Sequence, residues 1–368
     1  MHRPKSKVGG TRPIDRPPLR RYVGVIDEDR RCAAVPRSGE ERGLTTALES
    51  HDITGEAAEA GAGTIRIALA GIGKIARDQH IPHLAANKRF SVVAAVTGHT
   101  PPEGVPGFRT ITEMMQAVPD VQAISICTPP RGRLALIEEA LEHGLDVMIE
   151  KPPAATLSEA EDFVRLAREA GRVLFTTWHS REAAGVEPAR AWLAEREIRR
   201  VEVNWKEDVR VWHPGQAWIW EPGIGVFDPG INALSVITQI LPRPLLLQDA
   251  ALRFPSNRPA PIAADLSFTD TAGVPVDVFF DFDQRGPQTW DVDVETDRGH
   301  LKLSMGASKM FVDGVEQDVG DEPEYARLYR RFADLLDRRE SDVDLSPFRH
   351  VADAFLIGRR SEVGAFEE

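Results

Sequence analysis

The chain has 368 residues, more than one hydrophobic core usually organises, and this length predicts two domains plus a tail. Its net charge of −12 and its 42% apolar residues are typical of a globular protein and give no electrostatic reason to expect a nucleic acid as partner. Cys32 and Cys127 lie too far apart in sequence to indicate a disulfide framework, and no apolar run reaches the roughly 18 to 20 residues that cross a bilayer, so we expect a cytoplasmic protein without membrane contact.

The first 63 residues differ in composition from the rest. They are rich in Arg, Pro and Gly and have little periodicity, so we predict a disordered or weakly ordered extension over residues 1–63. A basic targeting peptide is one alternative, although Asp15 and the prolines would interrupt its amphipathic helix. A start codon assigned too far upstream is the other.

Residues 64–180 alternate between strand and helix patterns. We predict strands over 64–70, 90–96, 121–128, 145–151 and 173–180, because these stretches are apolar and rich in β-branched residues. Helical patterns lie between them, up to about Leu84 and over 135–144 and 158–171. This alternation predicts a dinucleotide-binding Rossmann domain, that is, a doubly wound parallel sheet with helices on its faces.

The pattern changes after residue 180. One helix is expected over 186–197, and then apolar and polar residues alternate over 199–212, 275–283, 289–297 and 300–305. Alternation with a period of two indicates strands with one buried face, and the helical pattern returns over 324–355. We therefore predict a second α/β domain over 181–368 with an open, mostly antiparallel sheet for substrate binding and oligomerisation.

A glycine turn follows the first predicted strand. Gly71, Gly73 and Ala76, with Lys74 and Ile75 between them, form a GxGxxA motif, in which the glycines allow a tight bend and close approach to a pyrophosphate. A turn into a helix also needs glycine for ordinary backbone reasons. The position between a strand and a helix favours cofactor binding, because the helix N-terminus can hold phosphates.

Further cofactor contacts are expected at the carboxyl ends of later strands. Thr97 and His99 follow the second strand, where no carboxylate is present to bind a ribose 2′-hydroxyl, and this favours NADP over NAD without excluding use of both. We also assign cofactor contacts to four residues that follow the next two strands in the crevice: Thr128, Pro129, Glu150 and Lys151.

Three motifs together resemble one enzyme family. GxGxxA at 71–76, EKP at 150–152 and DPGIN at 228–232 are similar to the glucose–fructose oxidoreductase, inositol dehydrogenase and MocA (Gfo/Idh/MocA) family, over about Ile65 to Phe366. Longer segments, including GIGKIARDQHIP, TWHS and WKEDVRVWHPGQAWIWEP, resemble the bacterial L-arabinose and D-galactose 1-dehydrogenases of that family. The resemblance implies that hydride leaves the anomeric carbon of an aldopyranose such as L-arabinose, D-galactose or D-fucose, and that an aldonolactone forms.

The proposed chemistry centres on Lys151 and Asp228. Many family members carry a histidine four residues after this aspartate, but here the position is Asn232, as in the pentose and galactose enzymes. Residues at i and i+4 share a helix face, so both could contact one substrate. Because an amide exchanges no proton at neutral pH, acid–base work is left to Lys151 and Asp228.

Tryptophans and polar residues are dense between Trp205 and Glu221. Indole faces suit pyranose C–H bonds, and we assign substrate contacts to Glu207, His213 and Trp220, while recognising that a single Trp is more often a core residue. Glu207 and His213 are favoured because the matching positions contact sugar in the arabinose enzyme. His179 could contact substrate or be structural.

The remaining histidines are not expected to take part in chemistry or to bind a metal. His80 and His83 are interpreted as structural, and no cluster predicts a metal site. Two alternatives to the sugar 1-dehydrogenase stay open: an inositol or other aldose dehydrogenase of the same fold, and a non-catalytic NADP sensor. The open sheet is compatible with a homodimer or a homotetramer.

Overall fold

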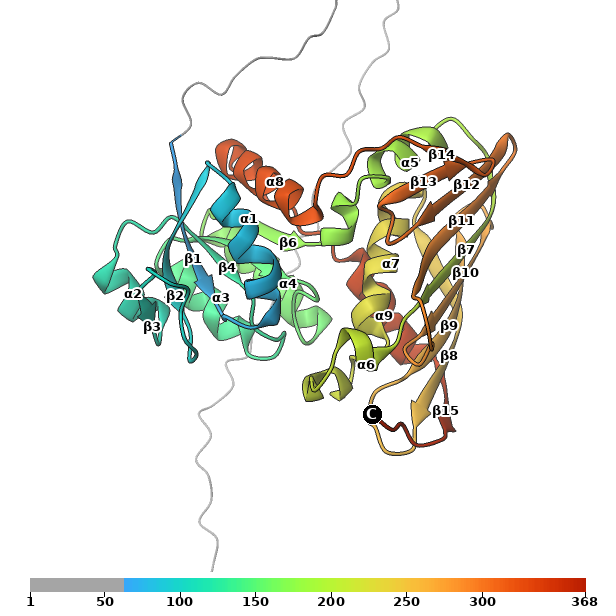
Figure 1. The fold of residues 1–368 in the computed structure, drawn as a ribbon, viewed down its shortest axis with the longest axis horizontal. Coiled ribbons are helices and arrows are strands. Elements are labelled where there is room, and N and C mark those ends of the chain that lie inside the picture. Colours follow the sequence, from blue (N-terminus) through green and yellow to red (C-terminus); the bar gives the residue numbers. More distant parts are fainter. Residues whose placement is uncertain (1–62) are drawn as a thin grey trace, which may run out of the picture. The chain divides into compact units, whose positions relative to one another are not determined.

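The computed structural model describes residues 63–368, and the predicted extension over residues 1–63 lies, except for its last residue, outside the described part together with Cys32. Two β-sheets organise the described chain (Figure 1). One has six strands and the other has nine, so the predicted fold class is confirmed.

All neighbouring strands of the first sheet are parallel, in the order β3-β2-β1-β4-β5-β6. The strands are β1 (Ile65–Ala70), β2 (Phe90–Val96), β3 (Gly107–Phe108), β4 (Ala123–Ile126), β5 (Asp146–Glu150) and β6 (Leu174–Thr177). The strand order reverses between β1 and β4, and ligands of doubly wound sheets bind in the crevice at such a reversal. β4 and β5 are buried along their whole length, as a sheet covered on both faces requires.

Helices connect these strands and cover the sheet. They are η1 (Ala76–His80, a π-helical turn), α1 (Ile81–Ala86), α2 (Ile111–Ala117), α3 (Arg133–Glu142) and α4 (Leu157–Glu169). The start of α4 is fixed by the side chain of Thr156, which accepts a hydrogen bond from Glu159 N at 3.3 Å.

One helix from the C-terminal part of the chain also packs on the first sheet. Figure 1 shows α8 (Glu324–Arg338) beside the first sheet. Its buried face includes Tyr329 and Phe332, which belong to the same apolar cluster as Ile67 and Leu69 of β1. The single boundary predicted at residue 180 does not account for this helix, because its packing partners lie more than 100 residues earlier in the chain.

The second sheet has the order β14-β13-β12-β11-β7-β10-β9-β8-β15. Its strands are β7 (Ile198–Lys206), β8 (Leu245–Pro255), β9 (Ala263–Asp270), β10 (Pro275–Asp281), β11 (Thr289–Thr296), β12 (Gly299–Ser304), β13 (Lys309–Val312), β14 (Val315–Gln317) and β15 (Arg359–Val363). Two pairs, β7 with β10 and β8 with β15, are parallel, and the other pairs are antiparallel.

Helices and short turns complete this part of the chain. They are η2 (His179–Glu182), α5 (Val186–Leu193), α6 (Val209–Trp212), η3 (Ala217–Trp220), α7 (Phe227–Ile240) and α9 (Ser346–Ile357). α7 is buried on most of its surface, and Gly230 lies so close to β10 that an added Cβ would approach Phe280 Cε2 to 2.6 Å. No helix within residues 63–368 is long and apolar enough to span a membrane.

Some predicted elements have other bounds in the structure, such as the helix predicted over 186–197, which ends at Leu193. The strand predicted over 199–212 stops at Lys206, because the Asp208 side chain accepts a hydrogen bond from Arg210 N at 3.0 Å and begins α6. The helical stretch predicted over 324–355 is divided at Arg339, whose φ of 58° ends α8. Pro347 then lies in the first turn of α9.

Candidate active site

A cleft of about 590 Å³ lies at the carboxyl ends of the first sheet and reaches residues of the second part of the chain. Its lining from the first part includes Gly73, Lys74, Ile75, Thr128, Pro129, Glu150 and Lys151, all predicted to bind cofactor. From the second part it includes Trp212, His213, Gln216, Trp218 and Asp228. The cleft therefore joins the predicted cofactor residues to part of the predicted sugar pocket.

The glycine turn between β1 and η1 has the geometry of a phosphate cradle. Gly71 has a φ of +87°, and a Cβ there would lie 2.7 Å from Thr128 Cγ2, so only glycine fits. A Cβ on Gly73 would meet no atom within 4 Å, which leaves its backbone open to a ligand in the cleft. Ala76 is fully buried where the helix packs on the sheet. These residues fit a dinucleotide.

The end of β2 is more basic than its local sequence suggests. Thr97 and His99 bond to each other, Oγ1 accepting from the His99 backbone N–H at 2.9 Å, and neither lines the cleft. The Arg77 guanidinium donates to Thr100 O at 2.9 Å. Arg109 lies beside Gly98, where an added Cβ would be 3.6 Å from its Nη1. Neither arginine is among the predicted cofactor residues. Arg109 follows β3, and the pairing of β3 with β2 brings it back to this point, which the local sequence does not show.

The predicted acid–base pair is in contact. Lys151 directly follows β5, and its Nζ lies 3.2 Å from Asp228 Oδ1 and donates to Asp228 O at 3.1 Å. Asp228 is in the first turn of α7, where the partial positive charge of a helix N-terminus stabilises a carboxylate. The side chains are only 13% and 5% exposed, so an amine and a carboxylate meet in a site with little water.

Two more predicted substrate residues adjoin this pair. His213 Nε2 lies 3.7 Å from Asp228 Oδ2 and 3.5 Å from Glu207 Oε1. The Glu207 carboxylate is buried and accepts a hydrogen bond from Trp290 Nε1 at 3.0 Å. Among the described residues, His213 Nδ1 is a buried nitrogen without a hydrogen-bond partner.

The aromatic wall of the cleft differs in part from the prediction. Trp212 and Trp218 line the cleft, and Trp212 packs on Trp290 of β11 with ring centroids 4.9 Å apart. Trp290 is not among the predicted substrate residues and lies far from the tryptophan-rich segment in sequence. Trp220 is not part of the lining; it is buried against Phe366 at 4.8 Å, so its predicted contact with substrate is corrected to a packing role.

Glu207 is also absent from the cleft lining, as are two other predicted substrate residues. Asn232 is half-buried one turn after Asp228 on α7, on the same helix face. His179 bonds through Nδ1 to Glu324 Oε2 at 2.6 Å and stacks on Tyr325 at 5.6 Å. This contact with α8 gives His179 a structural role, which is one of the two roles expected for it, and His179 does not line the cleft.

Glu150 has a different surrounding from its neighbour Lys151. Its carboxylate is 3% exposed and accepts hydrogen bonds from His80 and Tyr325. Burial alone would raise its pKa, but the hydrogen bond and charge of His80 outweigh this and lower the pKa of Glu150 to about 2. The residue is therefore an ionised carboxylate at the edge of the cleft, directed away from it into the protein.

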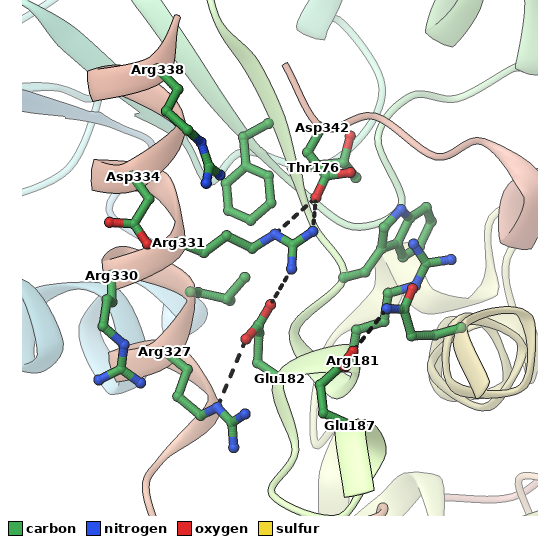
Figure 2. Close-up of a pocket in the computed structure, with 14 residues that line it drawn as sticks. Thr176, Arg181, Glu182, Glu187, Arg327, Arg330, Arg331, Asp334, Arg338 and Asp342 are labelled. Atoms are coloured by element: carbon green, nitrogen blue, oxygen red, sulfur yellow. Dashed lines mark hydrogen bonds and ion pairs between the residues drawn. The ribbon is translucent and has the colours of Figure 1, made fainter. Parts of the chain in front are cut away.

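A second cavity, of about 360 Å³, lies between α8, η2 and α5 (Figure 2). Its arginines and carboxylates largely pair with one another; Arg331 Nε, for example, donates to Asp342 Oδ2 at 2.9 Å. Within residues 63–368, no group of three or more His, Cys, Asp or Glu residues could hold a metal ion. The first cleft, with its lysine–aspartate pair and glycine turn, is the candidate active site.

Sequence comparison agrees with this geometry. Residues 65–177 match the oxidoreductase family with an NAD-binding Rossmann fold, Gfo/Idh/MocA. The chain is 46% identical over 302 residues to a galactose 1-dehydrogenase from Pseudomonas fluorescens, and the match covers 82% of this chain and 98% of that protein. An inositol 2-dehydrogenase from Rhodococcus jostii is 30% identical over 122 residues, which cover 31% and 33% of the two chains.

Solved structures give the same relation. A D-galactose-1-dehydrogenase from Rhizobium etli has 50% identity and a TM-score of 0.81, with 83% of this chain and 99% of that chain covered. A 3-ketoreductase from Actinomadura kijaniata in complex with TDP-benzene and NADP has a TM-score of 0.70 at 18% identity, covering 82% and 100% of the two chains. At this identity the 3-ketoreductase shows similarity of fold alone.

Proposed function

Since the chain belongs to the Gfo/Idh/MocA oxidoreductase family, we propose that it oxidises the anomeric carbon of D-galactose or a sugar with the same ring configuration to the aldonolactone, with NADP as preferred acceptor. The single observation that carries the proposal is the contact of Lys151 Nζ with Asp228 Oδ1 at 3.2 Å inside the cleft. Identity over nearly the whole length of two galactose 1-dehydrogenases supports the choice of sugar.

The lysine and the aspartate have separate roles in the proposed reaction. As C1 loses hydride, the O1–H bond must break so that a C1=O double bond forms, and Asp228 accepts that proton. Lys151 donates a hydrogen bond to O1 and holds the Asp228 carboxylate beside it. When bound, the nicotinamide ring accepts the hydride.

The sugar would be oriented by polar groups of fixed direction. Glu207 is held by Trp290, and His213 lies between Glu207 and Asp228, so both can bind ring hydroxyls near the reacting carbon. Trp212 and Trp218 offer apolar faces to the pyranose C–H bonds. Buried groups that need a hydroxyl partner discriminate strongly against sugars lacking it.

The preference for NADP is supported by the arginines near β2. Thr97, Gly98 and His99 bring no carboxylate to the place where NAD enzymes bind the ribose 2′-hydroxyl. Arg77 and Arg109 border the same segment, and guanidinium groups bind phosphate well.

Replacing Arg109 with Gln should raise KM for NADP about tenfold and leave KM for NAD nearly unchanged.

The test is the initial rate of NADP and NAD reduction at 340 nm with D-galactose, D-fucose, L-arabinose, D-glucose, D-xylose and myo-inositol. L-Arabinose and D-fucose share the ring configuration of D-galactose, so we expect turnover of these three sugars and little turnover of the others.

Lys151→Met, which removes the amine at similar side-chain length, should lower kcat by at least about a hundredfold. Turnover of myo-inositol alone would favour the inositol alternative, and cofactor binding without turnover of any sugar would favour a sensor.

A further inference from the structure

The carboxylate of Glu150 is fully engaged by three donors. Oε1 accepts from His80 Nε2 at 2.9 Å and from the Tyr325 hydroxyl at 2.8 Å, while Oε2 accepts from the backbone N–H of Lys151 at 3.0 Å. Because the third donor belongs to the catalytic lysine itself, the position of this carboxylate fixes the backbone from which the Lys151 side chain extends.

His80 is held in turn by groups from two elements. Its Nδ1 lies 2.7 Å from the Tyr329 hydroxyl of α8 and 3.3 Å from Ser125 Oγ of β4. The imidazole is completely buried, which opposes its charge, but Cys127, Tyr329 and, to a smaller extent, Glu150 raise the pKa of His80 well above its ordinary value. His80 and Glu150 thus form a buried ion pair directly behind Lys151.

α8 supplies both tyrosines and is itself anchored from two sides. One face packs on the first sheet, where Phe332 stacks on Phe90 and Phe175. On another face, Arg331 points toward Asp342 and Glu182 (Figure 2). It binds Asp342, and its Nη1 lies 3.6 Å from Glu182 Oε1. The Tyr325 hydroxyl therefore has little freedom to leave Glu150.

We propose that Tyr325 and His80 are positioning residues for the reaction: they orient Glu150, which holds the Lys151 backbone and so sets the distance between the Lys151 amine and Asp228. This inference rests on the proposed function for its kinetic readout. Neither Tyr325 nor His80 lines the cleft, so neither contacts sugar or cofactor directly. Their loss should therefore change kcat more than KM.

The first test compares two substitutions on the same buried face of α8. Tyr325→Phe removes only the hydroxyl that binds Glu150 and should lower kcat about tenfold with KM for galactose and Kd for NADP nearly unchanged. Phe332→Leu removes buried ring contacts without touching Glu150 and should lower Tm but leave kcat unchanged. Wild-type kcat in Tyr325→Phe, or equal losses of kcat in both variants, would overturn the proposal.

The second test uses pH. In His80→Gln the amide can still donate to Glu150, but the cationic partner is lost, so burial raises the pKa of Glu150 and kcat should fall as the pH drops toward 5. The wild type should show a smaller loss over this range, since its Glu150 stays ionised. The other titratable or charged groups around this carboxylate are Arg133, His179, Lys151, Tyr325 and Cys127. An unchanged pH profile would show that His80 only fills space.

A readout without turnover separates this inference from the proposed function. Acetylation of Lys151 at fixed pH, followed by peptide mass spectrometry with exposed Lys88 as internal reference, reports how firmly the amine is held. Faster labelling of Lys151 in Tyr325→Phe, but not in Phe332→Leu, would support the positioning role even if no sugar were oxidised. Equal labelling rates in wild type and Tyr325→Phe would reject it whatever the substrate.

Discussion

At the scale of single residues, the cleft is lined by the Lys151 amine, the Asp228 carboxylate and the His213 imidazole. Lys151 contacts Asp228, and His213 lies between Asp228 and Glu207. A family histidine would add a proton-exchanging group one turn later on α7, but Asn232 occupies that position. We therefore propose Asp228 as the carboxylate that takes the substrate proton.

The role of Asp228 can be tested with a substitution that keeps its size. Asp228→Asn retains hydrogen bonding but removes the base, so kcat for galactose should fall about 10² to 10⁴-fold with a much smaller change in KM. Steady-state kinetics measures this, with Asp265→Asn as control, because Asp265 pairs with Arg253 on the second sheet away from the cleft. Retention of wild-type kcat by Asp228→Asn would mean that another group accepts the proton.

At the scale of elements, a strand or helix could be predicted where its local hydrophobic pattern was strong. The predicted bounds of β2 agree with the observed Phe90–Val96, since an apolar strand followed by polar residues and glycine has a clear local signal. α7 gave no such signal, because a helix buried on most of its surface lacks an amphipathic pattern and Pro229 and Gly230 disfavour helix. Its place in the prediction came from the family resemblance instead.

The β1–η1 turn offers a test at this scale. Gly71→Ala would place a Cβ 2.7 Å from Thr128 Cγ2 in a left-handed conformation, so the turn must shift and Kd for NADP should rise at least about tenfold. Isothermal titration calorimetry measures this change. Gly273→Ala is the matched control: its φ is +84° and its Cβ would meet nothing within 4 Å, so it should lower stability by about 1 kcal/mol and leave Kd unchanged.

At the scale of the whole molecule, the sequence predicted both sheets and the cofactor crevice but not the long-range contacts behind them. Tyr325 and Glu150 are 175 residues apart, and nothing local marks either as a partner of the other. Likewise, Trp290 reaches Glu207 and Trp212 through the pairing of β11 with β7, which places it opposite Trp205. Oligomerisation stays a prediction, and light scattering of the purified protein would distinguish a monomer from the proposed dimer or tetramer.

The buried ion pair between η1 and β5 also links folding stability to pH. Glu150 has a pKa lowered from 4.5 to about 2, so its stabilising contribution is complete above 4.5 and is lost as the pH falls toward 2. The raised pKa of His80 acts in the other direction: its contribution is complete below 6.5 and is lost as the pH rises through the folded-state value. Stability should therefore fall when the protein is acidified below about pH 4.5.

The contribution of Glu150 can be isolated by comparing Tm at pH 3 and pH 6 by circular dichroism. Its pKa change corresponds to about 3 kcal/mol, so Glu150→Gln should be less stable than wild type at pH 6 and lose less Tm on acidification. Asp249→Asn is the control, because the exposed ion pair of Asp249 with Arg359 is screened by solvent and should change this difference little. If Glu150→Gln lost as much Tm as wild type between the two pH values, other carboxylates would account for the acid sensitivity, and the His80–Glu150 pair would contribute little to holding η1 on β5.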